Sequence, residues 1–259
     1  MAGIKDRLDF SGKVALVTGA SGGRGLGSAI ARSFHELGAA IVNLDIADGT
    51  GLFPTRYLYL AGDATDEEAV RAALGQTAAA FGRLDVLVNN VGIISKSPMD
   101  LFDMSLFRQV LEVNIVSTAL VTKHSLELLK KSGSGRIINI ASVQAHIGTA
   151  TYSAYSASKA AICGLTRVWA KELLPFGLTV NSICPGFAYT EMFERGMEKL
   201  VIEAGLTREE AMAEIVKDCP QKRPLQPREV GELAVFLGSE LAAGLTGQSI
   251  HLDGGMVMA

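Results

Sequence analysis

The segment KVALVTGASGGRGLGSAIARSFHEL, residues 13–37, decides how this chain folds. It begins with a short apolar run, continues through a glycine-rich turn at 18–27 and ends in a pattern typical of a helix. Glycines at such a turn let the backbone approach a pyrophosphate, while the helix N-terminus presents free N–H groups and a positive potential. The segment indicates a dinucleotide site; a plain tight turn between strand and helix is the alternative.

The rest of the chain repeats this alternation of apolar runs and helical patterns. The runs are rich in Val, Ile and Leu and end in Gly, Asn, Asp or Ser, like strands buried on both faces of a parallel sheet. The predicted strands cover residues 13–19, 39–45, 57–60, 84–90, 135–142, 178–186 and 248–255, and the predicted helices cover 25–37, 66–81, 104–131, 152–174 and 227–238. This predicts one α/β domain over residues 1–259, a Rossmann-type doubly wound parallel sheet of about seven strands with helices on both faces.

The segment from 187 to 224 interrupts this alternation. It carries two short helical patterns and a Thr207-x-x-Glu210 capping box instead of a strand followed by a long helix. We predict that residues 187–224 form a lid over a substrate, and we call them the lid segment.

Composition narrows the class of partner. A net charge of -3 and a pI near 5.9 argue against a nucleic acid or an anionic membrane surface, so we expect a small-molecule partner. The N-terminus has no continuous apolar core, and the other apolar stretches look too short to span a membrane. The three cysteines and four histidines have no metal-ligand spacing, so no metal is predicted, and a cytoplasmic location with reduced cysteines is the default.

Two charged residues bear on the choice of dinucleotide. Asp45 closes the second apolar run, where a carboxylate accepts hydrogen bonds from the adenosine ribose hydroxyls and repels a 2′-phosphate. Arg24, in the glycine-rich turn, favours NADP because a guanidinium pairs with such a phosphate. The repulsion between a carboxylate and a nearby phosphate costs more free energy than an ion pair with a mobile surface arginine contributes. The sequence therefore predicts NAD, with NADP as the less favoured cofactor.

Polar residues also follow the third and fourth runs, at the sheet edge where ligands bind. Asp63, followed by Ala64, is placed to accept the adenine amino group. Asn90, followed by Val91 and Gly92, is placed to bond the backbone across the cleft, although a turn-forming asparagine explains it nearly as well.

Tyr155 and Lys159 lie four residues apart in a helical pattern, so both side chains emerge on one face. An ammonium about 4 Å from a phenol, at an effective dielectric near 20, contributes roughly 4 kcal/mol, enough to lower a tyrosine pKa from ~10 towards ~7. The phenol then exchanges protons near neutrality. Taken alone, the pair is more often a cation beside a surface ring. Ser142, at the end of a predicted strand, makes a catalytic grouping the better interpretation.

Together these motifs resemble the short-chain dehydrogenase/reductase family along essentially the whole chain. The resemblance rests on the glycine-rich turn, the strand-end residues, Asn114, Ser142, Tyr155-Ser-Ala-Ser-Lys159, Pro185-Gly186-x-x-x-Thr190 and the closing Asp253-Gly254-Gly255. It implies a catalytic tetrad in which Tyr155 transfers the substrate proton and Ser142 binds the carbonyl oxygen. Lys159 would lower the tyrosine pKa and bind the nicotinamide ribose, and Asn114 would hold a water in a proton relay.

The resemblance also extends the cofactor site. Pro185, the backbone of Phe187 and Thr190 would border the nicotinamide carboxamide. The whole predicted cofactor set is Gly19, Ser21, Arg24, Gly25, Leu26, Gly27, Asp45, Asp63, Ala64, Asn90, Val91, Gly92, Tyr155, Lys159, Pro185, Phe187 and Thr190.

Three features depart from the family pattern. The glycine-rich turn is two residues longer, which leaves the alignment of residues 21–24 open. The stretch from Asp45 to Asp63 leaves little room for a helix between the second and third strands. The lid segment is longer than in compact members, which suggests an enclosed substrate.

The predicted reaction is hydride transfer between NAD(H) and a secondary alcohol or ketone, with polyols, sugars, hydroxy acids and 3-oxoacyl compounds all open. Ser142, Gln144, Tyr155 and Tyr189 are the predicted substrate contacts. An NADPH-dependent carbonyl reductase and a non-enzymatic dinucleotide sensor are the alternatives, and the complete tetrad argues against the sensor. The resemblance also implies a homotetramer or homodimer that assembles through the helices at 104–131 and 152–174.

Overall fold

A seven-stranded parallel sheet forms the centre of the molecule, as predicted. The computed structural model describes residues 3–258. The strands are β1 (Val14–Thr18), β2 (Ala40–Asp45), β3 (Tyr57–Ala61), β4 (Val86–Asn89), β5 (Arg136–Ile140), β6 (Thr179–Pro185) and β7 (Ser249–Leu252). Their order across the sheet is β3-β2-β1-β4-β5-β6-β7, with every neighbouring pair parallel.

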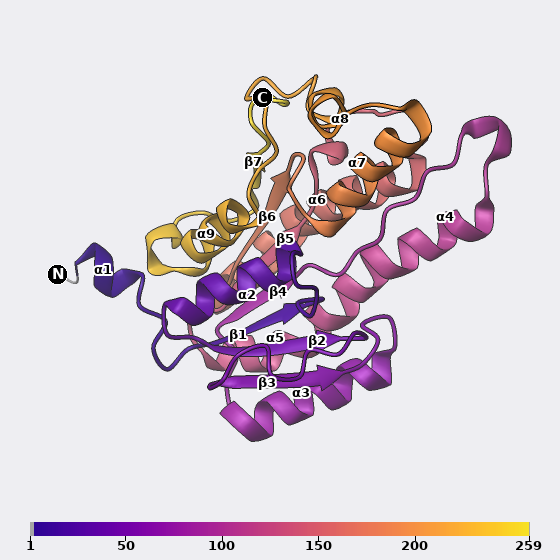
Figure 1. The fold of residues 1–259 in the computed structure, drawn as a ribbon. Coiled ribbons are helices and arrows are strands. Elements are labelled where there is room, and N and C mark those ends of the chain that lie inside the picture. The colour runs from indigo at the N-terminus through magenta and orange to yellow at the C-terminus, as the bar shows by residue number, and fades with distance from the viewer. Residues whose placement is uncertain (1–2, 259) are drawn as a thin grey trace.

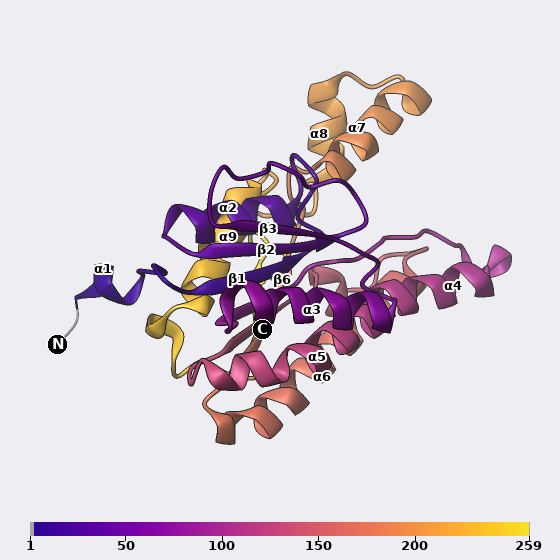
Figure 2. The same ribbon diagram turned by 90° about the horizontal axis from the view of Figure 1, so that it is seen from below.

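Helices cover both faces of this sheet. The α-helices are α1 (Ile4–Arg7), α2 (Leu26–Glu36), α3 (Glu67–Phe81), α4 (Met104–Leu111), α5 (Ser117–Lys131), α6 (Ser153–Leu173), α7 (Glu191–Ala204), α8 (Arg208–Ile215) and α9 (Pro227–Gly238). Shorter helices are η1 (Met99–Leu101), the π-helical η2 (Glu112–Val116), η3 (Val143–Ala145), η4 (Leu174–Phe176) and η5 (Glu240–Ala242). Figures 1 and 2 show α2 and α9 on one face and α3, α5 and α6 on the other.

The alternation of side chains along each strand produces two cores. Successive side chains of a strand point to opposite faces, so Ala15 and Val17 of β1 join the core under α2 and α9. Val14 and Leu16 join the core under α3, α5 and α6. Every residue of β1 is buried, which explains why the run is apolar throughout rather than alternating.

The connection between β2 and β3 lacks the usual helix, as the short stretch of sequence predicts. Residues 46–56 are all described, and they form turns and bends only. Phe53 is buried there between the rings of His35 and Tyr57, with ring centroids 4.5 and 5.2 Å away. One aromatic side chain therefore covers the part of the sheet that a helix would cover elsewhere.

A single long helix follows β4, built from α4, the π-helical η2 and α5. Residues Met104–Lys131 are long and apolar enough to cross a membrane by length and composition alone, since an 18-residue window within them has a mean hydropathy of 1.2. This differs from the sequence expectation. Their contacts with β4, β5 and α3 place this helix on one face of the sheet. The extra residue of a π turn shifts the helix register at the point where Asn114 lies.

The lid segment folds into α7 and α8, which stand beyond the strand ends marked by the arrowheads (Figure 2). The two helices pack on a small apolar cluster of their own, centred on Phe193 and Met197. Thr207 and Glu210 form the predicted capping box, in which the Glu210 carboxylate accepts from the Thr207 N–H at 2.8 Å. Its role as a lid stays a prediction.

Candidate active site

The predicted site residues gather where the sheet reverses its direction of growth, between β1 and β4. Asn90 joins the two strands, because its side-chain amide donates to the carbonyls of Thr18 and Gly19 at 2.9 and 3.1 Å. The buried Thr18 hydroxyl in turn accepts from the backbone N–H groups of Asn90 and Val91. Asn90 therefore bonds the backbone across the cleft, as predicted, and fixes the crevice in which such sheets bind ligands.

The glycine-rich turn leaves space that only glycine allows. Gly19 has a φ of +69°, a left-handed conformation that favours glycine. A Cβ atom on Gly27 would lie 2.3 Å from the Gly19 carbonyl oxygen, so a side chain cannot be accommodated there. The α2 N-cap is Gly25, which among the described residues supplies no side-chain hydrogen bond to the first turn. The N-terminus of α2 therefore fits a phosphate, whose oxygens would satisfy these N–H groups.

Asp45 lies beside this turn, at the end of β2. Its carboxylate accepts from the Ser21 N–H at 2.8 Å and from the Ala47 N–H at 3.0 Å. Two backbone donors hold the negative charge at the adenosine end of the crevice. The structure thus places Asp45 next to Ser21, where the sequence predicts a ribose contact.

Arg24, in the same turn, pairs with the lid segment. Its guanidinium lies 3.2 Å from the Glu194 carboxylate on α7, and Glu194 is also 3.6 Å from Arg208 and accepts from the Tyr189 hydroxyl at 3.1 Å. The longer glycine-rich turn projects toward the lid segment, which explains this placement. Arg24 therefore ties the turn to the lid segment, and its contact with a cofactor stays a prediction.

Glu194 therefore governs how tightly α7 is held. We expect Glu194→Gln to speed hydrogen exchange of the α7 amides about two- to fivefold, because two partly exposed ion pairs of up to about 1 kcal/mol each are lost. Glu203→Gln is the matched control, since Glu203 pairs only within α7, with Lys199 at 3.7 Å. Equal exchange in the two variants, measured by mass spectrometry, would show that Arg24 and Arg208 do not restrain the lid.

The other predicted cofactor residues lie along the same edge. Asp63 follows β3, is exposed, and accepts from both the N–H and the hydroxyl of Thr65; Ala64 beside it is buried. Pro185 ends β6, and the Phe187 carbonyl accepts from Leu225 at 2.8 Å. Thr190 caps α7 through its hydroxyl. None of these contacts contradicts the predicted contact set.

Lys159 is a buried cation whose ammonium donates to the Ile140 carbonyl at 2.8 Å. Burial lowers the pKa of Lys159 to about 8, and the neighbouring thiols Cys163 and Cys184 partly oppose this shift. A Cβ atom on Gly92 would lie 3.3 Å from both the Lys159 ammonium and the Asn114 side-chain oxygen. The missing side chain at Gly92 leaves space above two polar groups, which fits a ribose between them.

Asn114 is fully buried at the π turn and holds the segment after β4 in place. Its side-chain oxygen accepts from the Ile93 N–H at 2.8 Å, and its amide donates to the Ile93 carbonyl at 3.0 Å and the Ser158 hydroxyl at 2.9 Å. The Thr118 hydroxyl donates to the Asn114 backbone carbonyl. These contacts show a positioning role for Asn114, while a water relay stays a prediction.

Ser142 and Tyr155 complete the predicted tetrad. The Ser142 hydroxyl accepts from the Gln144 N–H at 3.1 Å and caps η3. Burial raises the pKa of Tyr155, and a hydrogen bond with Ser142 lowers it by less. The predicted fall toward neutrality is therefore wrong for the protein without cofactor. The Lys159 ammonium lies 5.7 Å from the tyrosine ring centroid and is bonded to Ile140, so desolvation exceeds its effect.

Two of the predicted substrate contacts, Gln144 and Tyr189, differ in whether they have a polar atom free to bind a substrate. The Gln144 amide donates to the Thr149 hydroxyl at 2.9 Å, while its oxygen is buried without a hydrogen-bond partner in the described chain. The Tyr189 hydroxyl is bonded to Glu194 inside the lid segment, so this group is less free than predicted. Gln144 is the contact that offers an unused acceptor.

Sequence spacing missed a cluster of metal-type side chains behind Ser142. His146, Cys184 and His251 bring one ligand atom each within 4.8 Å of one another, although they are far apart in the chain. Cys163 lies 3.9 Å from Cys184. The pairing of β6 with β7 and the position of η3 unite the three residues, and no local spacing could have indicated that.

Comparisons with known proteins agree with this geometry. The family model described as Enoyl-(Acyl carrier protein) reductase matches residues 19–257. Cis-4-hydroxycyclohexanecarboxylate dehydrogenase of Sinomonas cyclohexanicum is 37% identical, over 95% of this chain and 97% of that protein. L-fucose dehydrogenase of Bos taurus is 38% identical, over 95% and 90%. The structure of Thermoplasma acidophilum aldohexose dehydrogenase superposes with a TM-score of 0.87 at 32% identity, covering 98% of this chain and 96% of that one. The chain belongs to the short-chain dehydrogenase/reductase family, and it is an oxidoreductase acting on CH–OH groups.

Proposed function

We propose that this protein is an NAD(H)-dependent dehydrogenase or ketone reductase of a small hydroxylated substrate. The cofactor, when bound, supplies or accepts the hydride. The Tyr155 phenol transfers the proton of the substrate oxygen, and the Ser142 hydroxyl donates a hydrogen bond to that oxygen as its charge develops. Lys159 binds the ribose above Gly92 and favours the charged form of the phenol. The clustering of these residues at one sheet edge carries the proposal.

Asp45 is the reason for choosing NAD. Its carboxylate is fixed by two backbone N–H groups beside the glycine-rich turn, so it cannot swing away from an incoming group without losing both bonds. Ribose hydroxyls donate to such a carboxylate, whereas a 2′-phosphate would add like charge beside it. Arg24, the residue that favours NADP, is paired with Glu194 instead.

An NADPH-dependent carbonyl reductase is the second candidate, because Arg24 stays on the same turn and is exposed. It requires Arg24 to leave Glu194 and a phosphate to lie near Asp45. A dinucleotide sensor without chemistry would not need Ser142, Tyr155 and Lys159 together.

The unused acceptor of Gln144 favours a substrate with more than one hydroxyl. A buried oxygen without a partner costs about 1–3 kcal/mol, which a second substrate hydroxyl would recover. Dehydrogenases of a sugar and of a hydroxy acid among the relatives support this class. We therefore place sugars, polyols and hydroxy acids ahead of 3-oxoacyl compounds.

Assembly and location complete the proposal. We infer a homotetramer or homodimer through the helices of 104–131 and 152–174. Apolar side chains at the end of α6 support this, since Val168 and Leu174 are about half exposed, at 53% and 51%. A cytoplasmic location agrees with three free, buried thiols.

Asp45→Asn tests the cofactor choice. We expect the wild type to use NAD, and we expect the variant to shift the ratio of kcat/KM for NAD over NADP toward NADP by about ten- to a hundredfold, because charge repulsion disappears. Asp48→Asn is the control, since Asp48 is an exposed carboxylate in the same loop that accepts from Thr50. A wild type that turns over only NADP, or an unchanged ratio in Asp45→Asn, would overturn the NAD proposal.

A further inference from the structure

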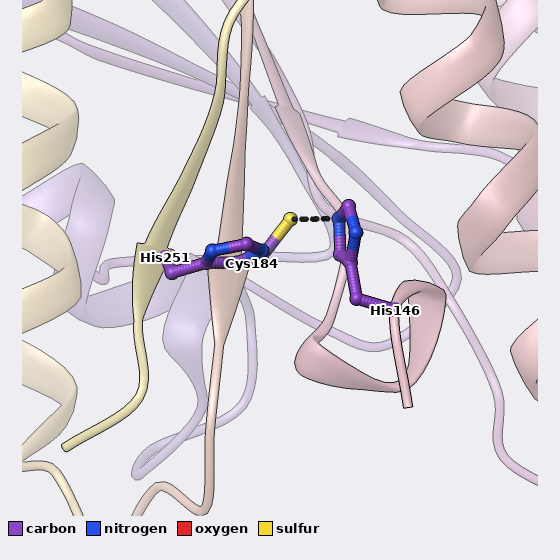
Figure 3. Close-up of side chains that lie close together, drawn as sticks. All are labelled: His146, Cys184 and His251. Carbon is purple, nitrogen blue, oxygen red and sulfur yellow. Dashed lines mark hydrogen bonds between the residues drawn. The ribbon is translucent and has the colours of Figure 1, made fainter. Parts of the chain in front are cut away.

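Two imidazoles and two thiols gather behind the candidate active site. His146 follows η3, Cys184 lies on β6 and His251 on β7, and Figure 3 shows their side chains converging from these three elements. One ligand atom of each lies within 4.8 Å of the others. Cys163, on α6, adds a second sulfur.

The fold itself imposes this grouping. Cys184 is paired with His251 in the parallel register of β6 and β7, so the two side chains extend from the same face of the sheet. The η3 turn returns over that face and brings His146 Nε2 to 3.8 Å from the Cys184 sulfur. None of the four residues belongs to the predicted tetrad.

The separations among His146, Cys184 and His251 are short enough for a zinc site. Bonds of about 2.3 Å to sulfur and about 2.0–2.1 Å to nitrogen imply ligand separations of about 3.6 Å for N···S and 3.8 Å for S···S. His146 Nε2 lies 3.8 Å from Cys184 and 3.9 Å from Cys163, and the two sulfurs are 3.9 Å apart. The separation of His146 and Cys184 is therefore already close to the length that zinc requires, and the ligand atom of His251 lies within 4.8 Å of both.

An unused ligand nitrogen and a route of entry are also present. His251 Nε2 is buried and has no hydrogen-bond partner within the described residues, so a nitrogen of the cluster is free to bind a metal. His146 is exposed, which opens the cluster to solvent.

We propose that His146, Cys184 and His251 bind one Zn²⁺ ion, with a water molecule as the fourth ligand. Thiolate and imidazole donors in a four-coordinate arrangement select zinc over magnesium or calcium, which take oxygen ligands. Binding of Cys184 as thiolate releases its thiol proton to solvent. The ion would hold His146 at the C-terminal end of η3, the turn that Ser142 caps at its other end. The site does not depend on the identity of the dinucleotide.

Zinc titration of the full chain tests the proposal. The protein is reduced, stripped with a chelator and titrated with Zn²⁺ by calorimetry, with bound metal counted by mass spectrometry. We expect one zinc per chain and at least about hundredfold weaker binding in His146→Ala and in His251→Ala. His35→Ala and His124→Ala remove the other two histidines and should bind as the wild type does. If the wild type does not bind Zn²⁺, or if the two control variants weaken zinc binding as much as His146→Ala and His251→Ala do, the proposed zinc site is wrong.

Cobalt reports directly on the sulfur ligands. Co²⁺ in the site should show thiolate charge-transfer absorption and the intense visible bands of tetrahedral coordination, and Cys184→Ser should abolish the former or weaken it strongly. Cys219→Ser is the control, because Cys219 is a buried thiol in the apolar cluster of the lid segment. His146 is exposed, so His146→Ala keeps the test decisive if Cys184→Ser fails to fold. A wild-type cobalt spectrum without charge transfer would contradict thiolate ligation.

Discussion

Tyr155→Phe lowers kcat/KM by about 10³–10⁴, because the phenol is the proposed proton donor and acceptor and phenylalanine carries no exchangeable proton. The ring stays in place, so the fold and cofactor affinity should be unchanged. Burial raises the pKa of Tyr155, so the free protein holds the phenol protonated at neutral pH, ready to donate to a ketone. Oxidation of an alcohol requires the phenolate and should accelerate as pH rises.

Steady-state kinetics and cofactor fluorescence titration check this result. Tyr152→Phe is the matched control, since its ring centroid is 6.4 Å from that of Tyr155 and the same atom is removed nearby. Comparable activity in Tyr155→Phe and the wild type would exclude the phenol from the chemistry, whichever substrate is used.

Lys159→Met should lower kcat/KM at least about a hundredfold and change the pH dependence of stability. Burial lowers the pKa of Lys159 to about 8 in the folded chain, against 10.5 for an exposed lysine. Between these values the unfolded chain binds more protons, so the free energy of unfolding of the wild type rises with pH. The wild type should gain up to about 3 kcal/mol relative to the methionine variant between pH 8 and 10.5. Below pH 8 the full cost of the buried charge is present.

Urea unfolding at several pH values, on the protein without cofactor, measures this difference. Lys171→Met is the control, because Lys171 lies on the same helix and is exposed. If the free energies of unfolding of the wild type and Lys159→Met differ by a constant amount from pH 7 to pH 10, Lys159 titrates as an ordinary surface lysine.

The sheet and its helices were predictable because strands buried on both faces require continuous apolar runs. β1 and β6 illustrate this, since every residue of each is buried. The predicted strand bounds were less accurate at the edge of the sheet. A strand was predicted over 248–255, whereas β7 ends at Leu252. Its side chains are only half-buried, so the apolar signal there is weak.

The polar details of the site were predictable only in part. Asp45 and Asn90 follow strands, so their places at the sheet edge come from chain order alone. The direction of Arg24 depends on a partner, Glu194, that lies on a distant helix, and local sequence contains no signal for it. The π turn at Asn114 likewise depends on tertiary contacts with Ile93 and Ser158.

The most direct test of the central claim follows the transferred hydrogen. Sugars, polyols and hydroxy acids carrying deuterium on the carbinol carbon are incubated with wild-type protein and NAD, and the NADH formed is analysed by mass spectrometry. Our account predicts that one substrate of the panel yields NADH carrying one deuterium per molecule, and that Tyr155→Phe yields almost none. NADH formed without deuterium, or no turnover of any substrate by a protein that binds NADH, would contradict direct hydride transfer between NAD and a CH–OH group.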